Sequence, residues 1–504
     1  MSSPPRASFD RSIVEGPIRP AVWRLAWPTM LQNIIAGLQG IIDHAMVGHF
    51  VGYTANAAIG VSWQIIIVVI VFAVSVFTGM GVLVARFAGA NQPEKVNRVV
   101  YQAFLTAAGL AVILGAVGWA AAPSLLDLVN AAPAVHAEAL PFLRTMFIGI
   151  IGMMMFFMLS GAFRAAGDVH TPLRLGVAMT ALTIAFNLTL IPALGTVGAA
   201  YGTVASSTIV SGYGIWRLIA PHAAGVRRGD PASRPQSVIH FERGMELHPD
   251  FAIIRSLFRF GLPTGVQGIA MNVAGVLLIR FIGSLDRSAE AQAAYAVGYT
   301  ELFSLITWTS VGLMGAASTV AGQNLGAGRA DRAMAGVRVA SEIGLGVAAV
   351  VGALFLLVPR YLLAIFGMTD VAVIDIGEQL LRYLSVSGLF ITVALSYTGG
   401  LQGTGDTRSP LYISILSQIV VPLGLCWFLQ ATTGLAAGHI WMAILFGHII
   451  RCALSVVRFR QQKWRHITVD LEPPKPRIVT AESELPGAEP HIPMHDVPTP
   501  TPRS

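Results

Sequence analysis

Charge is scarce in this sequence. Of its 504 residues, only 12% are Asp, Glu, Lys or Arg, whereas a typical soluble domain carries about 25%. Hydrophobic residues make up 54% of the chain, and the mean hydropathy is +0.66. This balance excludes an ordinary soluble protein and predicts a polytopic membrane protein. The length of the apolar runs excludes a membrane β-barrel, whose strands alternate over about ten residues.

Cysteine and the motifs of catalysis are scarce as well. The two cysteines, Cys426 and Cys452, lie in apolar stretches, which favours a packing role over redox or metal chemistry. The sequence shows no metal-ligand cluster, catalytic triad or ATP-binding module. The glycine-rich stretch 322–328 lacks the Lys-Ser/Thr of a phosphate-binding loop, so we interpret it as a tight hairpin between two spans. We expect no enzymatic activity, cofactor, metal or nucleic-acid partner, but transport driven by an ion gradient.

Apolar runs of membrane length recur along the chain and predict an all-α protein with twelve transmembrane helices. The predicted spans are residues 22–47, 56–85, 98–122, 139–163, 172–192 and 196–219 in the first half, and 255–283, 292–321, 335–358, 377–402, 410–430 and 436–458 in the second.

These spans divide the chain into two six-helix lobes, an N-lobe over 22–219 and a C-lobe over 255–458. The remaining segments are predicted to be cytoplasmic: an N-terminal segment over 1–21, a polar linker over 220–254, and a proline-rich disordered tail over 459–504.

The distribution of Lys and Arg supports this topology, because basic residues collect in cytoplasmic loops. When each is assigned to its nearest loop, 28 of the 33 fall on the side of the termini and the linker. The five exceptions are Arg144, Arg280, Arg287, Arg360 and Arg382. Both termini are therefore predicted to be cytoplasmic, which an even number of spans requires.

The two halves contain an internal repeat. Three segments recur at shifts of 235 to 238 residues: Trp27–Gln32 at Leu262–Gln267, Gly89–Ala90 at Gly326–Ala327, and Gly161–Leu173 at Gly399–Leu411. Because each half has six spans, the second half enters the membrane in the same orientation as the first. The lobes are then related by a pseudo-twofold axis along the membrane normal. Asp168 and Asp406, in the third repeated segment, are predicted to cap the helices that follow them.

The first span carries an acid at membrane depth. Asp43 lies fifteen residues after Pro28, or about 22 Å along a helix. Intramembrane acids usually face a cavity and bind something. Burial in an apolar bundle favours the neutral carboxyl, which can take up a proton near neutral pH. Asp43 is thus a candidate coupling site, although a structural, hydrogen-bonded carboxylate is the alternative. Its counterpart in the repeat is Leu278.

These motifs resemble those of the multidrug and toxic compound extrusion (MATE) family over nearly the whole membrane region. The matching elements are Pro28, the Asp43–Gly48 segment, the loop 89–91, the Gly-Asp-x-x-x-Pro turns at 167–172 and 405–410, and the stretch 322–328. The resemblance implies an antiporter that expels amphipathic, often cationic compounds in exchange for protons or sodium ions.

The resemblance also implies roles for particular residues. Asn187 matches the asparagine that the family places near the first-span aspartate. The second aspartate of some proton-coupled members is replaced here by Ile191, which puts a two-carboxylate site in doubt. The acids of sodium-type members correspond to Met271 and Ile391. We therefore favour protons over sodium and retain sodium coupling as an alternative.

Further candidates lie in both halves. Glu301 in the eighth span, opposite Gln64, is either a C-lobe contact for an ion or cationic substrate, or a carboxylate near a helix mouth. Met154 and Phe157 belong to a Met/Phe-rich run that suits a promiscuous pocket, with lipid-facing or interhelical packing as the alternative. Two further assignments are Gln267 as a substrate contact and Pro28 as a conformational hinge.

Together these features predict a monomeric secondary antiporter in the inner (plasma) membrane. Its expected partners are the lipid bilayer, a small organic cation, and a proton or sodium ion. The runner-up is a flippase for a lipid-linked precursor. An anionic headgroup would need several basic residues at the cavity, and only Arg144, Arg280 and Arg382 are candidates.

Overall fold

Helices are the only regular elements in the part of the chain that the computed structural model describes, residues 9–129, 132–219, 239 and 248–469. The predicted linker lies largely outside these residues, as does the predicted tail beyond residue 469. The helices of the first half are α1 (Ser12–Glu15), α2 (Ile18–Phe50), α3 (Tyr53–Gly89), α4 (Pro93–Leu128), α5 (Pro133–Ile148), α6 (Ile150–Ala166), α7 (His170–Leu194) and α8 (Thr196–Ile219).

The second half repeats this order with three irregular turns. Its helices are α9 (Phe251–Gly283), α10 (Ser288–Tyr295), the π-helix η1 (Ala296–Leu302), α11 (Ser304–Gly326), α12 (Ala330–Leu357), α13 (Pro359–Ile365), α14 (Val371–Thr404), α15 (Arg408–Ile415), the π-helix η2 (Leu416–Val420), α16 (Val421–Thr432), α17 (Ala437–Arg460) and the 3-10 turn η3 (Lys463–His466).

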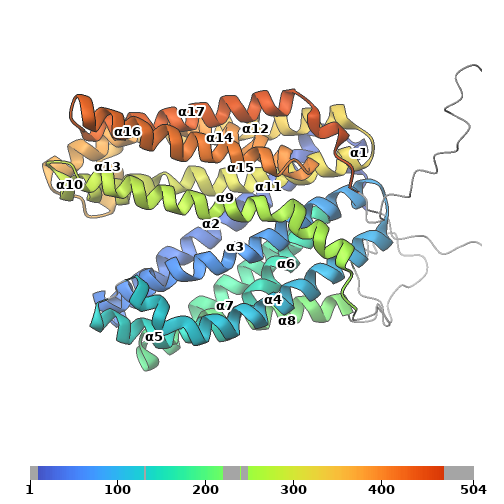
Figure 1. The fold of residues 1–504 in the computed structure, drawn as a ribbon, viewed down its shortest axis with the longest axis horizontal. Helices are drawn as coiled ribbons and strands as arrows, with labels where there is room; N and C mark the ends of the chain where they lie inside the picture. The colour runs from blue at the N-terminus through green and yellow to red at the C-terminus, as the bar shows by residue number, and fades with distance from the viewer. Residues whose placement is uncertain (1–8, 130–131, 220–238, 240–247, 470–504) are drawn as a thin grey trace, which may run out of the picture. The chain divides into compact units, whose positions relative to one another are not determined.

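Each predicted span corresponds to one of these helices or to a run of consecutive ones. Among the described residues, nine segments are long and apolar enough to cross a membrane, and the pair α5–α6, bent by 51° at Gly149, makes ten. The other two predicted spans are α2 and α8. Both have the necessary length, but they are not among the segments that are apolar enough. Figure 1 shows the helices of the first half and those from α9 onward as two groups.

The repeated Gly-Asp turns have the same geometry in both halves. Gly167 and Gly405 end α6 and α14 with φ of 99° and 96°, a left-handed conformation that glycine adopts without strain. Asp168 Oδ1 accepts hydrogen bonds from the backbone N–H groups of His170 and Thr171 at the start of α7. Asp406 Oδ1 accepts one from Ser409 N. The predicted capping role of both aspartates is confirmed.

The two halves contact each other where α2 crosses α11 and α3 crosses α9, and glycine permits both close approaches. A Cβ on Gly312 of α11 would lie 2.6 Å from the Cα of Met30 in α2. A Cβ on Gly265 of α9 would collide with Ser75 of α3. Gly312 and Ser75 occupy equivalent repeat positions, as do Gly265 and Met30. The duplicated sequence therefore builds two related crossings from different residues.

Hydrogen bonds that join the halves cluster at the end of the bundle that carries α1 and η3, here called the terminal end, in the described part of the chain (Figure 1). Thr29 Oγ1 lies 2.9 Å from the carbonyl oxygen of Gly312, and Gln323 Nε2 donates to the carbonyl of Ala165 at 2.8 Å. Thr319 Oγ1 donates to the carbonyl of Arg164 at 3.2 Å. The halves are therefore tied together at this end.

Segments flanking the first and last spans add to these ties. Arg332 Nη2 donates to the carbonyl of Gly16, 2.7 Å away. Beyond α17, Trp464 is fully buried and stacks on Phe459 with ring centroids 5.0 Å apart. Arg86 of α3 donates to the carbonyl of Ile467 at 2.5 Å. Residues 459–469 are thus ordered, contrary to the disorder predicted from residue 459, because an apolar Trp side chain gains a buried site there.

Candidate functional site

The first-span acid lies at the contact between α2 and α7. Asn187 Nδ2 of α7 donates a hydrogen bond to Asp43 Oδ1 at 2.8 Å. Asp43 is partly exposed, whereas Asn187 is fully buried. The contact joins residues 144 positions apart in the sequence. The structure therefore brings together the two first-half residues that were predicted as ion-coupling groups.

Two further polar side chains extend this contact, and sequence reasoning missed them. Gln39, one helical turn before Asp43, also forms a side-chain hydrogen bond with its carboxylate. Thr180 Oγ1 of α7 donates to Gln39 Oε1 at 2.7 Å, which leaves the amide nitrogen of Gln39 free to face Asp43. The i, i+4 spacing of Gln39 and Asp43 was a usable signal, because residues four apart share a helix face.

Gly202 of α8 fixes the position of Asn187. A Cβ at Gly202 would collide with Asn187 Oδ1, so only glycine leaves room for the amide in this orientation. Asn187 Oδ1 is itself buried and has no hydrogen-bond partner among the described residues. The amide is thus oriented by packing against α8 and by its bond to Asp43.

The neighbouring histidine belongs to a different contact. His44 Nδ1 lies 2.7 Å from Asn56 Oδ1 of α3, on another side of α2 from Asn187. Ile191, where some family members carry a second acid, is 1% exposed. The Asp43 cluster therefore contains one carboxylate and two amides.

The C-lobe candidates are less closely connected. Glu301 is partly buried in η1, and within the described residues its carboxylate has no ion pair or hydrogen bond, including with Gln64, which is exposed on α3. Gln267 Nε2 donates to Ser414 Oγ of α15 at 2.6 Å, so this side chain ties α9 to α15. The binding roles of Glu301, Gln64 and Gln267 remain predictions.

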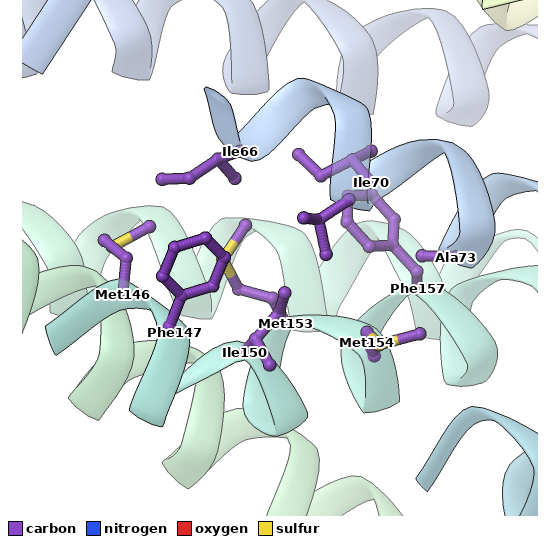
Figure 2. Close-up of a pocket in the computed structure, with 10 residues that line it drawn as sticks. Ile66, Ile70, Ala73, Met146, Phe147, Ile150, Met153, Met154 and Phe157 are labelled. Atoms are coloured by element: carbon purple, nitrogen blue, oxygen red, sulfur yellow. The ribbon is translucent and has the colours of Figure 1, made fainter. Parts of the chain in front are cut away.

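Met154 and Phe157 line a small apolar cavity in the N-lobe, shown in Figure 2. Side chains of α3, α5 and α6 surround it, and Ile66, Ile70 and Phe147 are among them. Its volume is about 10 Å³, room for no more than about one water molecule. In this conformation the Met/Phe-rich run packs against its neighbours near the bend between α5 and α6. Its role in substrate binding remains a prediction.

Pro28 is buried inside α2, which continues without a break on both sides of it. Proline has no N–H, so the carbonyl one turn earlier loses its helical partner and the helix is weakened at this point. Thr29 is the residue whose hydroxyl contacts Gly312. Pro28 thus adjoins a contact between the halves, and its role as a hinge remains a prediction. Among the described residues, no group of three or more His, Cys, Asp or Glu could hold a metal ion.

Comparison with known proteins decides the family. A family model described as MatE matches residues 28–189 and 263–428, which together are more than half of the chain. The chain belongs to the MATE family. The two matched segments fall in the two halves of the internal repeat. The chain is accordingly a multi-pass membrane transporter with twelve helices in two lobes, and it is not an enzyme.

Individual MATE relatives cover nearly the full length of this chain. The "Probable multidrug resistance protein NorM" of Thermotoga maritima is 25% identical over 457 residues, covering 89% of this chain and 93% of the relative. The "Multidrug resistance protein PmpM" of Pseudomonas aeruginosa is 26% identical over 470 residues, covering 89% and 94%.

Solved MATE structures share the fold. An "outward-facing conformation of a multidrug resistance MATE family transporter" superposes with a TM-score of 0.81 at 19% identity, covering 92% of this chain and 98% of that one. A MATE P26A mutant also gives a TM-score of 0.81, at 20% identity, covering 90% and 97%. MATE transporters move small molecules in a process coupled to ions, and the Asp43 cluster lies within this shared architecture.

Proposed function

We propose that this MATE transporter exports amphipathic, mainly cationic compounds in exchange for protons, with Asp43 as the coupling carboxylate. The observation that carries the proposal is a carboxylate in the first span held by two amides, those of Asn187 and Gln39. The multidrug resistance names of the relatives support an amphipathic substrate range.

The hydrogen bonds at Asp43 favour a proton over a sodium ion. A carboxylate offers about four lone-pair positions, and the amides of Asn187 and Gln39 each occupy one. A metal ion would need several oxygen ligands, whereas both amides present N–H donors to the carboxylate in this structure. A proton needs one free lone pair. The positions that correspond to the acids of sodium-type members are Met271 and Ile391, which carry no oxygen ligands in their side chains.

The contacts between the halves support a cycle of alternating access. With both termini placed in the cytoplasm, the ties at Thr29, Gln323 and Thr319 close the inward side. In the proposed cycle, a proton entering from outside neutralises Asp43 and releases the cationic substrate. The halves then separate at the terminal end, and loss of the proton to the cytoplasm restores a negative site that binds the next cation.

Transport by purified protein in liposomes tests this function. We expect efflux of a fluorescent organic cation under an imposed proton gradient, none under sodium alone, and none from Asp43→Asn with either gradient. Asn is nearly isosteric with Asp but cannot release a proton. His44→Gln is the matched control, because it alters the next residue of α2, whose ring contacts Asn56 instead of Asp43. It is expected to retain proton-driven efflux.

The other outcomes separate the alternatives. Efflux driven by sodium alone would contradict the proton assignment and direct attention to Glu301. No movement of any cation under either gradient would favour a lipid-linked substrate. The arginines proposed for an anionic headgroup offer that alternative little support, since Arg382 pairs with Glu378 at 2.7 Å and Arg144 lies over the ring of Trp119.

A further inference from the structure

The C-lobe contains a ladder of aromatic rings that begins and ends on α17. Trp441 stacks on Tyr295, with ring centroids 6.0 Å apart, and Tyr295 stacks on Tyr299 at 4.9 Å. Tyr299 stacks on Phe303 at 5.4 Å, and Phe303 stacks on the imidazole of His448 at 5.8 Å. The ladder passes through η1 and fixes the position of the His448 ring inside the lobe.

Beside the last ring lies a buried arginine without a counter-charge. Arg451 is 6% exposed and lies one turn after His448 on the same face of α17. In the described part of the chain Arg451 forms no ion pair. Its charge interacts there with His448 and with the hydroxyl of Tyr299. The backbone of Arg451 lies about 21 Å from the start of α17 and about 13 Å from its end, well within the span.

Four buried polar atoms on this stretch of α17 and on the neighbouring η2 lack partners among the described residues. His448 Nδ1, Arg451 Nε, and the hydroxyls of Ser455 and Ser417 are buried with no hydrogen-bond partner among the described residues. Ser455 follows Arg451 by one turn, and Ser417 belongs to η2, whose backbone packs against α17 at Gly447. Interruptions of the π-helical kind occur frequently at functional sites.

The chemistry of these four side chains indicates which charge a ligand would carry. An arginine side chain stays protonated and donates only. Both serine hydroxyls can donate, and the imidazole can present an N–H on Nδ1. An uncompensated cation at bilayer depth is energetically costly, and a bound anion would offset that cost. A second cation would be repelled.

We propose that Arg451, His448, Ser455 and Ser417 form a binding site in the C-lobe for one small monovalent anion, either a halide or a carboxylate group. This site is separate from the coupling site at Asp43 and does not depend on the proposed function. Its ligand charge is opposite to that of the exported compound.

Anion-dependent stability of the full-length protein tests the site. Thermal unfolding in detergent is measured while sodium methanesulfonate, which is neither a halide nor a carboxylate, is replaced by sodium chloride at constant ionic strength, and separately by sodium benzoate. Because a ligand that binds the folded state stabilises it in proportion to the logarithm of its excess concentration, we expect the wild-type midpoint to rise with the concentration of at least one anion. A rise with chloride identifies a halide, and a rise with benzoate alone identifies an organic carboxylate.

Variants on α17 separate this site from general salt effects. Arg451→Gln should abolish the rise. His448→Phe keeps a ring to stack on Phe303 but removes Nδ1. It should weaken the rise of the midpoint with anion concentration. This variant tests the site if Arg451→Gln does not fold. Arg458 lies on the same helix as Arg451, but its guanidinium pairs with Asp406. Arg458→Gln breaks that ion pair and should retain the full rise of the unfolding midpoint. An equal response in wild type and both site variants, or no response to either anion, would overturn the proposal.

Discussion

The two lobes have the same order of helices and the same turns, but they carry different polar groups in their interiors. The N-lobe has a carboxylate, Asp43, bound by Asn187. At the corresponding places the C-lobe has Leu278 and Leu425. Its interior contains instead the buried cationic and imidazole side chains of Arg451 and His448, with no carboxylate partner in the described residues.

This comparison teaches that duplication preserved what holds the lobes together and not what they bind. The shared glycines, prolines and turn aspartates set helix ends, whose geometry both lobes need. Interior polar groups are costly in an apolar bundle unless they are partnered. Each lobe therefore keeps only those that have a role of their own. The predictions below test this division through pairs of repeat-equivalent or matched positions.

Moving the acid to the other lobe should have the largest effect. We expect the double variant Asp43→Leu with Leu278→Asp to lower proton-driven efflux to the level of empty liposomes. In the C-lobe, Ala274 and Leu425 occupy the repeat positions of Gln39 and Asn187. The carboxylate at position 278 would therefore lack both amide donors. Recovery of efflux in the proteoliposome assay would show instead that the repeat position alone is sufficient for coupling.

Closing the α2–α11 crossing to a larger side chain should strongly destabilise the protein. Gly312→Leu places carbon 2.6 Å from the Met30 backbone, and we expect a loss of about 3 kcal/mol or more because two helices must separate. Gly346→Leu on α12 is the control, since a Cβ there meets nothing within 4 Å. The readout is the thermal midpoint in detergent. Equal midpoints for the two variants would contradict the close crossing.

The two turn aspartates should differ in their contribution to stability. Asp406 caps α15 and also pairs with Arg458 at 2.8 Å, whereas Asp168 only closes its turn onto α7. We expect Asp406→Ala to cost about 2–3 kcal/mol through the lost ion pair, and Asp168→Ala about 1 kcal/mol through the lost cap. Thermal unfolding of the two variants side by side measures the difference, and the reverse order would be inconsistent with the structure.

The smallest difference is expected between two repeated threonines. Thr29 Oγ1 contacts the carbonyl oxygen of Gly312, whereas Thr264 Oγ1 is buried with no partner in the part of the chain that the structure describes. We expect Thr29→Val to cost about 1 kcal/mol. Thr264→Val should be neutral or stabilising, because it removes an unsatisfied polar group. Unfolding midpoints of the two valine variants provide the test, and an equal loss in both would argue against the contact between the halves.

Much of the architecture follows from the sequence alone. Apolar runs of membrane length predict all twelve spans because a bilayer requires its backbone groups to be satisfied within helices. The repeated Gly-Asp-x-x-x-Pro segments predict the turns at Gly167 and Gly405, since a left-handed glycine and a capping aspartate act over a few neighbouring residues. Asp43 stands out as the acid of the first span for the same local reason.

Only the tertiary structure shows which side chains that are distant in the sequence contact each other. The sequence could not show that Thr180 supports Gln39, that Gly202 makes room for Asn187, or that Trp464 finds a buried site beyond the last span. The sequence also does not indicate that Arg451 is buried in the C-lobe with no acid beside it among the described residues. Hydrophobicity and turn chemistry act along the chain, whereas hydrogen bonding and close packing depend on which helices meet in space.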